Sequence, residues 1–411
     1  MTDALIIDAC RTPRGIGKQG KGALAEMHAQ HVTSTVLAAL AGRNDLVTAD
    51  VDDVLWGSTF HRSLHPRLSA LDAGFDPVVG GATLDRACGS SLTTVSLAAA
   101  SIIAGHMQLV IAGGTDMMSQ ASMGVPGAAG GPPLLDGGNL RLRARWPQAH
   151  QGVCADAVAT IEGISRQDLE AWGLESQKRA AKSIGEDRFA RSIVPVYRED
   201  GTLALDHDEY PRPQTTAESL AALKPAFEAI ADFQLNEDGL TFRKLIAARF
   251  PEVDIQFSHH AGVSSGVVDG SAGIVLASPD YARAHGMKPR ARIVAACSIG
   301  DDPTLMLNAP GPATHKVLAQ AGLTIDDIDL FEINEAFAVV VEKYIRDLGL
   351  DRDKVNVNGG SIALGHPIGA TGAMMIGTVL DELERRDLKR GLVTMCAAGG
   401  MAPAVIIERI G

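Results

Sequence analysis

Short apolar runs alternate with longer helical patterns along most of the 411-residue chain. A short apolar run bounded by turn residues predicts a buried strand, whereas apolar positions that recur about every 3.6 residues predict a helix. In the N-terminal part this pattern predicts strand 5–8, helix 27–40, strand 53–56, helix 90–104 and strand 109–112. Strands and helices that alternate in this way are typical of an α/β protein.

The same order returns in the C-terminal part, where the pattern predicts strands 291–296, 330–333, 355–357, 392–395 and 404–408 and helices 315–320, 337–348 and 372–384. In each half a helix rich in Ala, Gly and Ser precedes a strand that runs into Ala-Gly-Gly, at 112–114 and 398–400. Helices with so few charges are typical of a place between two layers, where close approach needs small side chains. The sequence therefore predicts an internal duplication with helices sandwiched between two sheets.

A long segment separates the two halves. It is rich in Gly and Pro at 124–138 and helical at 165–184 and 216–223, and the last strand of the first repeat is expected only after it, at 271–277. A long insertion that returns to the same sheet is typical of a lid or a binding domain. The predicted domains are the first part of the N-terminal domain at 1–116, the loop domain at 117–264, the return of the N-terminal domain at 265–285, and the C-terminal domain at 286–411.

Composition excludes several classes of function. A net charge of -12 with dispersed Lys and Arg argues against nucleic acid as a partner. Five scattered cysteines without CxxC spacing argue against a disulfide framework, and no His or carboxylate set has the spacing of a metal site. No apolar run approaches about 18 residues, and a strand near residue 4 leaves no room for a signal peptide, so we expect a soluble, cytoplasmic protein without a membrane partner. The basic cluster Arg141, Arg143 and Arg145 is either a solvated loop or a patch for a few phosphates.

The first candidate for chemistry is Cys88, which lies where an extended segment meets the small-residue helix. Its sulfur would sit at the positive end of the helix dipole, so we expect its pKa to lie below the free value of about 8.5. A thiolate there can take up an acyl group as a thioester. The alternative is a small buried cysteine that packs like alanine.

Three further polar residues lie at loops and strand ends. His366 lies on the glycine-rich loop 359–372, where an imidazole and backbone N–H groups can approach a substrate, although a plain turn histidine is the alternative. Cys396 follows strand 392–395, and the ends of strands in α/β folds gather catalytic groups; alone it would be a core residue. Asn334 either caps the next helix, with Glu335 in its first turn, or positions a water or a carbonyl.

Together these motifs resemble the thiolase family. The resemblance is carried by Asn-Glu-Ala-Phe-Ala at 334–338, the glycine-rich stretch at 359–372, Cys-Ala-Ala-Gly-Gly at 396–400, the surroundings of Cys88 and Ala-Cys-Arg-Thr-Pro at 9–13. Several motifs in the right order are highly specific, and they span nearly the whole chain. The resemblance implies the five-layer αβαβα thiolase fold, two duplicated βαβαβαββ domains with an inserted loop domain, assembled as a homodimer or homotetramer.

The resemblance also implies residue roles. Cys88 would be the nucleophile that carries the acyl group, His366 would activate it and bind the thioester oxygen, and Cys396 would donate and accept the proton at substrate C2. Asn334 would hold a water that joins His366 in the first oxyanion hole. The backbone N–H groups of Cys88 and Ala398 would form a second one, although many thiolases have glycine at the second position; the N–H keeps its place if φ stays negative.

The resemblance implies coenzyme A as a substrate, not as a permanently bound cofactor. The stretch 208–227 is similar to the loop-domain segment whose arginine lies beside the adenine and phosphates, which nominates Arg212. The stretch 261–266 resembles the pantetheine-binding segment, with Ser265 at the contact position. His150 begins a His-Gln-Gly similar to the His-Met-Gly of short-chain thiolases and is a candidate substrate or coenzyme contact.

The implied reaction is the reversible thiolytic cleavage of a 3-ketoacyl-CoA to acetyl-CoA and a shortened acyl-CoA, with a β-oxidation enzyme as a candidate partner. Two alternatives stay open: biosynthetic condensation of two acetyl-CoA molecules to acetoacetyl-CoA, and a non-catalytic acyl-CoA-binding protein. The chain departs from the family in a lengthened segment at 228–264, in Val263 where many members have Asn, and in Gln151 where they have Met. All three departures concern substrate binding and leave the chemistry intact.

Overall fold

A computed structural model describes residues 3–61, 65–123 and 134–410. The strands of its large sheet are β1 (Leu5–Arg11), β2 (Gly15–Ile16), β3 (Asp53–Gly57), β4 (Ala82–Leu84), β5 (Leu109–Met117), β8 (Val268–Ala277), β9 (Ala291–Gly300), β10 (Leu330–Ile333), β11 (Arg390–Thr394) and β12 (Met401–Arg409). Their order is β10-β11-β12-β9-β1-β8-β5-β3-β4, with β2 paired to β8. The sheet has two halves, which join where Leu5 and Ile6 of β1 pair with β9.

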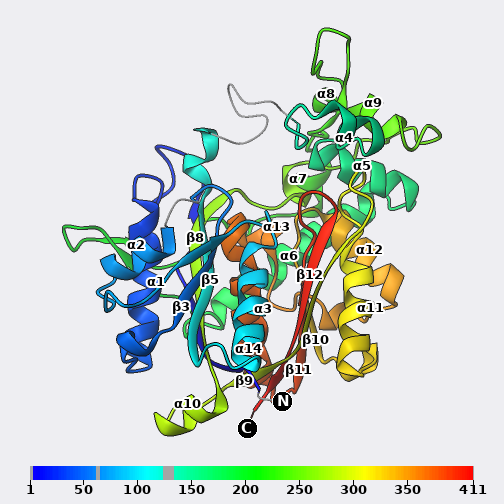
Figure 1. Ribbon diagram of the computed structural model, residues 1–411. Coiled ribbons are helices and arrows are strands. Elements are labelled where there is room, and N and C mark those ends of the chain that lie inside the picture. Colours follow the sequence, from blue (N-terminus) through cyan, green and yellow to red (C-terminus); the bar gives the residue numbers. More distant parts are fainter. Residues whose placement is uncertain (1–2, 62–64, 124–133, 411) are drawn as a thin grey trace.

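Helices form three layers around the two sheet halves (Figure 1). Between the halves lie α3 (Ser90–Ile103) and α14 (Thr371–Arg386), which pack on each other and on strands of both halves. On the outer faces lie α1 (Ala29–Arg43) and α2 (His65–Asp72) on one side and α11 (Pro310–Ala321) and α12 (Ala338–Leu348) on the other. The predicted five-layer αβαβα fold is confirmed.

The internal duplication is visible in the strand order. The run β3-β5-β8-β1 of one half matches β10-β11-β12-β9 of the other. In both runs the first pair is parallel and the next two pairs are antiparallel. The same sequence pattern has therefore folded twice into the same unit.

One predicted strand is wrong. Residues 355–357 form no strand, and only Val355 makes a single parallel bridge, to Phe331 of β10. This bridge is the counterpart of the parallel pairing between β3 and β4. It ends at once because Asn356 takes a positive φ of 46° and its side-chain amide bonds both the N–H and the carbonyl of Ile333, each at 2.8 Å. A side chain thus replaces the backbone ladder.

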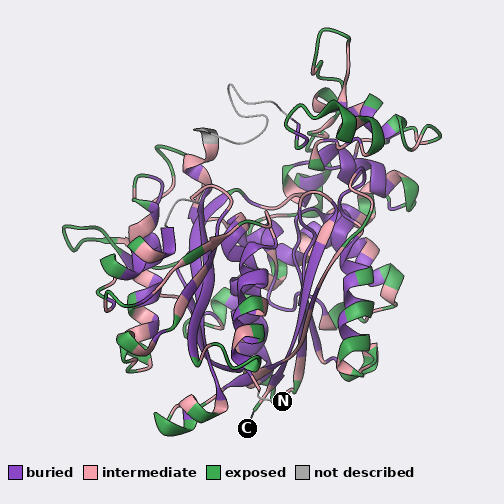
Figure 2. Ribbon diagram, viewed as in Figure 1, coloured by how far each residue is buried: buried purple, intermediate pink, exposed green. Residues whose placement is uncertain are grey.

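The central core depends on small residues. A Cβ at Gly372 of α14 would lie 2.4 Å from the backbone nitrogen of Leu92 on α3, so no other residue fits there without moving the helices apart. Apolar side chains from α3, α14 and both sheet halves fill the rest of this layer, and Figure 2 shows the strands and the two central helices as largely buried. Burial of this layer fixes how the two halves sit on each other.

The inserted segment lies between β5 and β8 and packs on the C-terminal half (Figure 1). It contains α4 (Leu140–Arg145), α5 (Gln151–Ile161), α6 (Arg166–Gly185), β6 (Val196–Tyr197), β7 (Leu203–Leu205), α7 (Ala217–Ala221), α8 (Glu228–Ala231) and α9 (Phe242–Ala247). Two further short α-helices are α10 (Pro279–Ala284) and α13 (Ser361–Leu364). Of the Gly- and Pro-rich stretch 124–138, residues 124–133 lie outside the described residues, and the predicted domain boundaries stay predictions. None of the helices in the described ranges has the length and apolarity needed to cross a membrane.

Candidate active site

Cys88 lies in the tight turn between β4 and α3. Ala87 takes a positive φ of 49°, which is uncommon for a residue with a side chain, and the Ser90 hydroxyl donates to its carbonyl at 2.6 Å. Gly89 is required because a Cβ there would lie 2.8 Å from the ring of Pro403 on β12. The turn therefore presents Cys88 at the junction of the two halves, half-buried.

The expected low pKa of Cys88 is wrong. Burial raises the pKa of its thiol to about 12, and the carboxylates of Asp116 and Asp85 raise it further. The N-terminus of α3 begins two residues later, as predicted, but such a terminus is worth about 0.3–1 kcal/mol, and one pKa unit costs about 1.4 kcal/mol. Desolvation outweighs the helix dipole, so the thiol stays protonated at physiological pH.

His366 is held on its loop by a backbone and a side-chain hydrogen bond. Its backbone N–H donates to the carbonyl of Gly266 at 2.8 Å, and its Nδ1 lies 2.6 Å from the Thr371 hydroxyl. Burial lowers the pKa of the imidazole to about 3, and the buried guanidinium of Arg14 adds repulsion. The ring is therefore neutral at physiological pH and can take up a proton.

Asn334 contacts the other nitrogen of this ring. Its Nδ2 lies 3.4 Å from His366 Nε2, and its Oδ1 accepts a hydrogen bond from the Ser361 hydroxyl at 2.6 Å. When Nδ2 donates to Nε2, the ring proton lies on Nδ1 and donates to Thr371. The helix-cap interpretation of Asn334 is wrong, because α12 begins at Ala338.

Glu335 does not add charge to a first helical turn, contrary to that interpretation. It is fully buried, and its carboxylate accepts four hydrogen bonds: from Trp172 Nε1 (3.0 Å), Ser176 Oγ (2.6 Å), Asn356 Nδ2 (3.0 Å) and the Ile362 N–H (3.0 Å). Burial raises its pKa. Through these bonds Glu335 connects α6 of the inserted segment to the loops beside Asn334.

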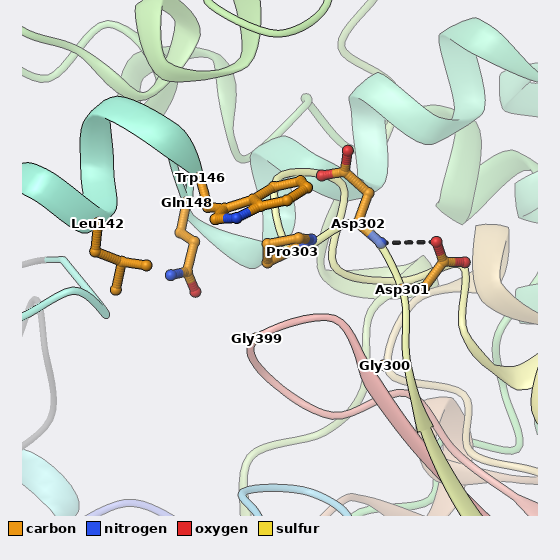
Figure 3. A pocket seen from close by; sticks show the side chains of 8 residues that line it. All are labelled: Leu142, Trp146, Gln148, Gly300, Asp301, Asp302, Pro303 and Gly399. Carbon is orange, nitrogen blue, oxygen red and sulfur yellow. Dashed lines mark hydrogen bonds between the residues drawn. The ribbon is translucent and has the colours of Figure 1, made fainter.

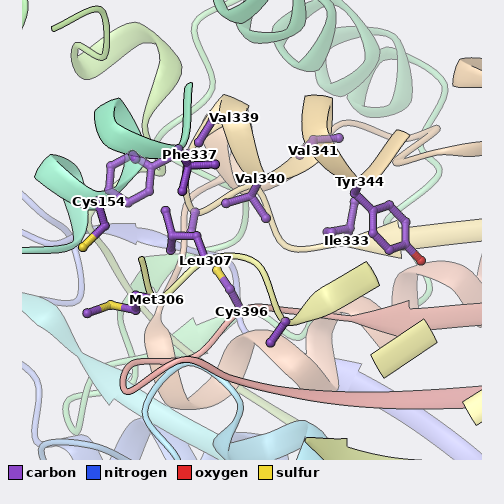
Figure 4. Close-up of a cluster of buried hydrophobic side chains, with 14 of the residues drawn as sticks. Cys154, Met306, Leu307, Ile333, Phe337, Val339, Val340, Val341, Tyr344 and Cys396 are labelled. Carbon is purple, nitrogen blue, oxygen red and sulfur yellow. The ribbon is translucent and has the colours of Figure 1, made fainter. Parts of the chain in front are cut away.

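Cys396 lies two residues after the end of β11. Ala397 and Met401 exchange two backbone hydrogen bonds, which closes a turn over Gly399 and Gly400, both with positive φ. Burial raises the pKa of the Cys396 thiol, and the charge of Cys88 raises it further. Figure 4 shows Cys396 within an apolar cluster near Leu307. Ala398 keeps a φ outside the left-handed region, the condition for its N–H to point as that of a glycine would.

The three residues expected to bind coenzyme A lie in different settings. Arg212 is exposed, with its guanidinium carbon 5.1 Å from the centre of the Tyr210 ring. Ser265 donates its backbone N–H to Ala336 (3.0 Å), beside the residue that accepts the His366 N–H. His150 caps α5 through Nδ1, which accepts the Gly152 N–H at 3.1 Å. The structure thus places Ser265 next to the loops of Asn334 and His366, Arg212 at the surface, and His150 in a capping position.

A cavity of about 620 Å³ opens beside the turn at Gly399 (Figure 3). Its other walls are the strand end at 300–303 and Leu142, Trp146 and Gln148 of the inserted segment. Of the three arginines on α4, Arg143 is engaged by Asp136 at 2.8 Å, whereas the other two line an adjoining hollow. The inserted segment therefore faces the backbone that carries Ala398.

Sequence reasoning missed the residues that orient the site. Thr371 and Ser361 fix the ring of His366 and the amide of Asn334, and both lie inside the glycine-rich stretch already singled out, where they were the hydroxyl side chains nearest the loop ends. In the described part of the chain no group of three or more His, Cys, Asp or Glu residues is placed to hold a metal ion.

Family comparison agrees with this geometry. The model for the thiolase N-terminal domain matches residues 4–231, and the model for the thiolase C-terminal domain matches residues 287–409. The chain belongs to the thiolase family. It is therefore an acyltransferase of a family that acts on coenzyme A substrates without a permanent cofactor.

Individual relatives match over their full length. The acetyl-CoA acetyltransferase of Thiocystis violacea is 37% identical over 425 residues, covering 100% of both chains, and a beta-ketoadipyl-CoA thiolase of Acinetobacter baylyi is 38% identical over 430 residues, again covering 100% of both. Among solved structures, the Bacillus anthracis acetyl-CoA acetyltransferase superposes with a TM-score of 0.83 at 33% identity, covering 100% of this chain and 99% of that one. Human mitochondrial 3-ketoacyl-CoA thiolase gives a TM-score of 0.82 at 31% identity with the same coverage.

Proposed function

We propose that this enzyme cleaves 3-ketoacyl-CoA with coenzyme A, through an acyl thioester on Cys88. The observation that supports the proposal is the neutral, buried imidazole of His366, which an asparagine amide contacts at 3.4 Å, together with two protonated thiols at the ends of neighbouring turns. One thiol can carry the acyl group while the other moves protons, and the imidazole serves the first.

In the first half-reaction His366 Nε2 takes the proton of Cys88, and the thiolate attacks the C3 carbonyl of the substrate. The C2–C3 bond breaks, the acyl group stays on Cys88, and the acetyl-CoA enolate takes a proton at C2 from Cys396. Because the pKa of Cys88 is far above that of His366, the resting pair is neutral. The thiolate forms only as it attacks, which protects the thiol from other electrophiles.

In the second half-reaction the Cys396 thiolate takes the proton of the coenzyme A thiol, which attacks the thioester. Cys88 leaves and recovers its proton from His366, so the protons balance over the cycle. Negative charge develops on an oxygen in each half-reaction. Asn334 and His366 would stabilise one oxyanion, and the N–H groups of Cys88 and Ala398 the other. Arg212, Ser265 and His150 are the proposed contacts to coenzyme A or the substrate.

Biosynthetic condensation of two acetyl-CoA molecules is the second candidate, because one site must catalyse both directions and several relatives are named acetyl-CoA acetyltransferase. We further propose a cytoplasmic homodimer or homotetramer, with a β-oxidation enzyme as a candidate partner. Light scattering of the purified protein measures the assembly directly.

The test is thiolysis of a panel of 3-ketoacyl-CoAs, from acetoacetyl-CoA through longer chains to 3-ketoadipyl-CoA, followed by loss of the ketoacyl enolate absorbance. Turnover that Cys88→Ser abolishes supports the proposal, and the chain-length profile names the substrate. Absence of turnover across the panel, with unchanged binding of acyl-CoA by Cys88→Ser, would favour the non-catalytic binding protein instead.

A further inference from the structure

A buried carboxylate joins the two catalytic loops. Asp116, at the end of β5, is fully buried, and it accepts hydrogen bonds from both sides of the junction between the sheet halves. From the N-terminal half the Ser58 hydroxyl donates at 2.8 Å and the N–H groups of Thr59 and Phe60 at 3.1 Å. From the C-terminal half the Gly369 N–H donates at 2.7 Å.

The backbone around Gly369 is packed so closely that no side chain fits there. A Cβ at Gly369 would lie 2.7 Å from the Asp116 carboxylate, and a Cβ at Gly114 would lie 2.0 Å from the Gly369 carbonyl. Gly369 lies three residues after His366 and two before Thr371, whose hydroxyl orients the imidazole. Whatever holds Gly369 therefore holds the whole turn that carries the base.

The other side of Asp116 leads to the nucleophile. Thr59, which Asp116 binds, also donates its hydroxyl to Asp85 at 3.4 Å, and Asp85 accepts the Ala87 N–H at 2.8 Å. Ala87 is the residue with positive φ that presents Cys88. A continuous set of hydrogen bonds thus runs from the turn of His366, through Asp116, to the turn of Cys88.

We propose that Asp116 is a positioning residue that locks the His366 turn onto the Cys88 turn, and that only its ionised form does so. The proposal rests on the function proposed above. Three of the donors are backbone N–H groups, which cannot reverse their polarity. A protonated Asp116, or an asparagine in its place, has a donor group where one of these N–H groups points. That N–H group then loses its acceptor and is repelled by the new donor.

The charge state of Asp116 changes in an accessible range. Burial raises its pKa to about 6, despite the hydrogen bonds that lower it. The titratable groups around it are Cys88, which stays protonated, Asp85, His61, whose pKa burial lowers to about 4, and Asp269 on the neighbouring strand β8, whose pKa burial raises to about 6. As pH falls through about 6, Asp116 takes up a proton and the clamp loosens, so kcat should fall.

Asp116→Asn is the test, and Asp269→Asn is its matched control. Asp269 is also fully buried and bonds the Ser119 N–H at 2.8 Å, which lies outside the His366 turn. We expect Asp116→Asn to lower kcat for thiolysis about 100-fold with a smaller change in KM, because a displacement near 1 Å can cost that much. It should also remove the fall of kcat near pH 6, whereas Asp269→Asn should retain both activity and the pH dependence.

Hydrogen exchange of the backbone at 366–372 gives a readout that does not depend on activity. We expect faster exchange in Asp116→Asn than in the control, and in the wild-type enzyme we expect protection, corrected for intrinsic rates, to fall below about pH 6. The wild-type measurement serves even if the variant does not fold. Unchanged protection in both experiments, or an equal loss of kcat in Asp269→Asn, would overturn the proposal. A wild-type protein without thiolysis would overturn the proposed function and leave the exchange test standing.

Discussion

Replacing Glu335 by Gln should destabilise the enzyme, although no charge is exposed and the size barely changes. The carboxylate receives four donors, two on each oxygen. An amide has one acceptor oxygen, and its NH2 group must face either Trp172 and Asn356 or Ser176 and Ile362. The Ser176 hydroxyl can turn and accept, but the other three donors cannot. One or two buried donors therefore lose their partner.

Each buried donor without a partner costs about 1–3 kcal/mol. Burial raises the pKa of Glu335, which shows that its buried charge is costly. The substitution removes this charge, and that gain offsets part of the loss. We expect a net decrease of about 2 kcal/mol in the free energy of unfolding. Urea unfolding at fixed protein concentration, followed by tryptophan fluorescence, measures it, with the exposed Glu237→Gln as control within about 0.5 kcal/mol of wild type. If Glu335→Gln unfolds at the wild-type urea concentration, the assigned role of the four bonds is refuted.

Three further predictions concern individual site residues. Thr371→Val should lower kcat about tenfold with KM unchanged, because Nδ1 of His366 loses its 2.6 Å partner; equal kcat would contradict this. Arg212→Ser should raise KM for coenzyme A about tenfold and spare kcat, whereas the exposed Arg283→Ser should change neither. The pKa of His366 is lower in the folded protein than in the unfolded chain, so the unfolded chain takes up this proton first as the pH falls below 6.5. The free energy of unfolding of the wild type, relative to that of His366→Asn, should therefore drop by about 1.4 kcal/mol per pH unit. A difference that does not change with pH would argue against a buried neutral imidazole.

Most of the fold was predictable because buried strands and helices require a periodic pattern of apolar residues in the sequence. Strand 330–333 and helix 90–104 lie within a residue of β10 and α3. The strand expected at 355–357 failed for a reason that periodicity does not record: the Asn356 side chain takes the backbone partners that a ladder would need.

The candidate site was predictable in its residue types and less so in its physical state. Cys88 does lie at the start of a helix, but only the folded structure shows the burial that outweighs the helix dipole. Asp116 and Glu335 are isolated acidic residues near strand ends in the sequence. Their roles depend on donors far along the chain, Gly369 for Asp116 and Trp172 for Glu335. The roles of the catalytic residues themselves stay predictions.

The most direct test of the central claim is to locate the acyl group. The enzyme is incubated with acetyl-CoA alone, quenched in acid, digested and analysed by mass spectrometry. An acetyl group on the peptide that contains Cys88, absent from Cys88→Ser and removed when coenzyme A is added before the quench, is the predicted result. An enzyme that turns over 3-ketoacyl-CoA while its acyl group lies on Cys396, or on no cysteine, would contradict the mechanism.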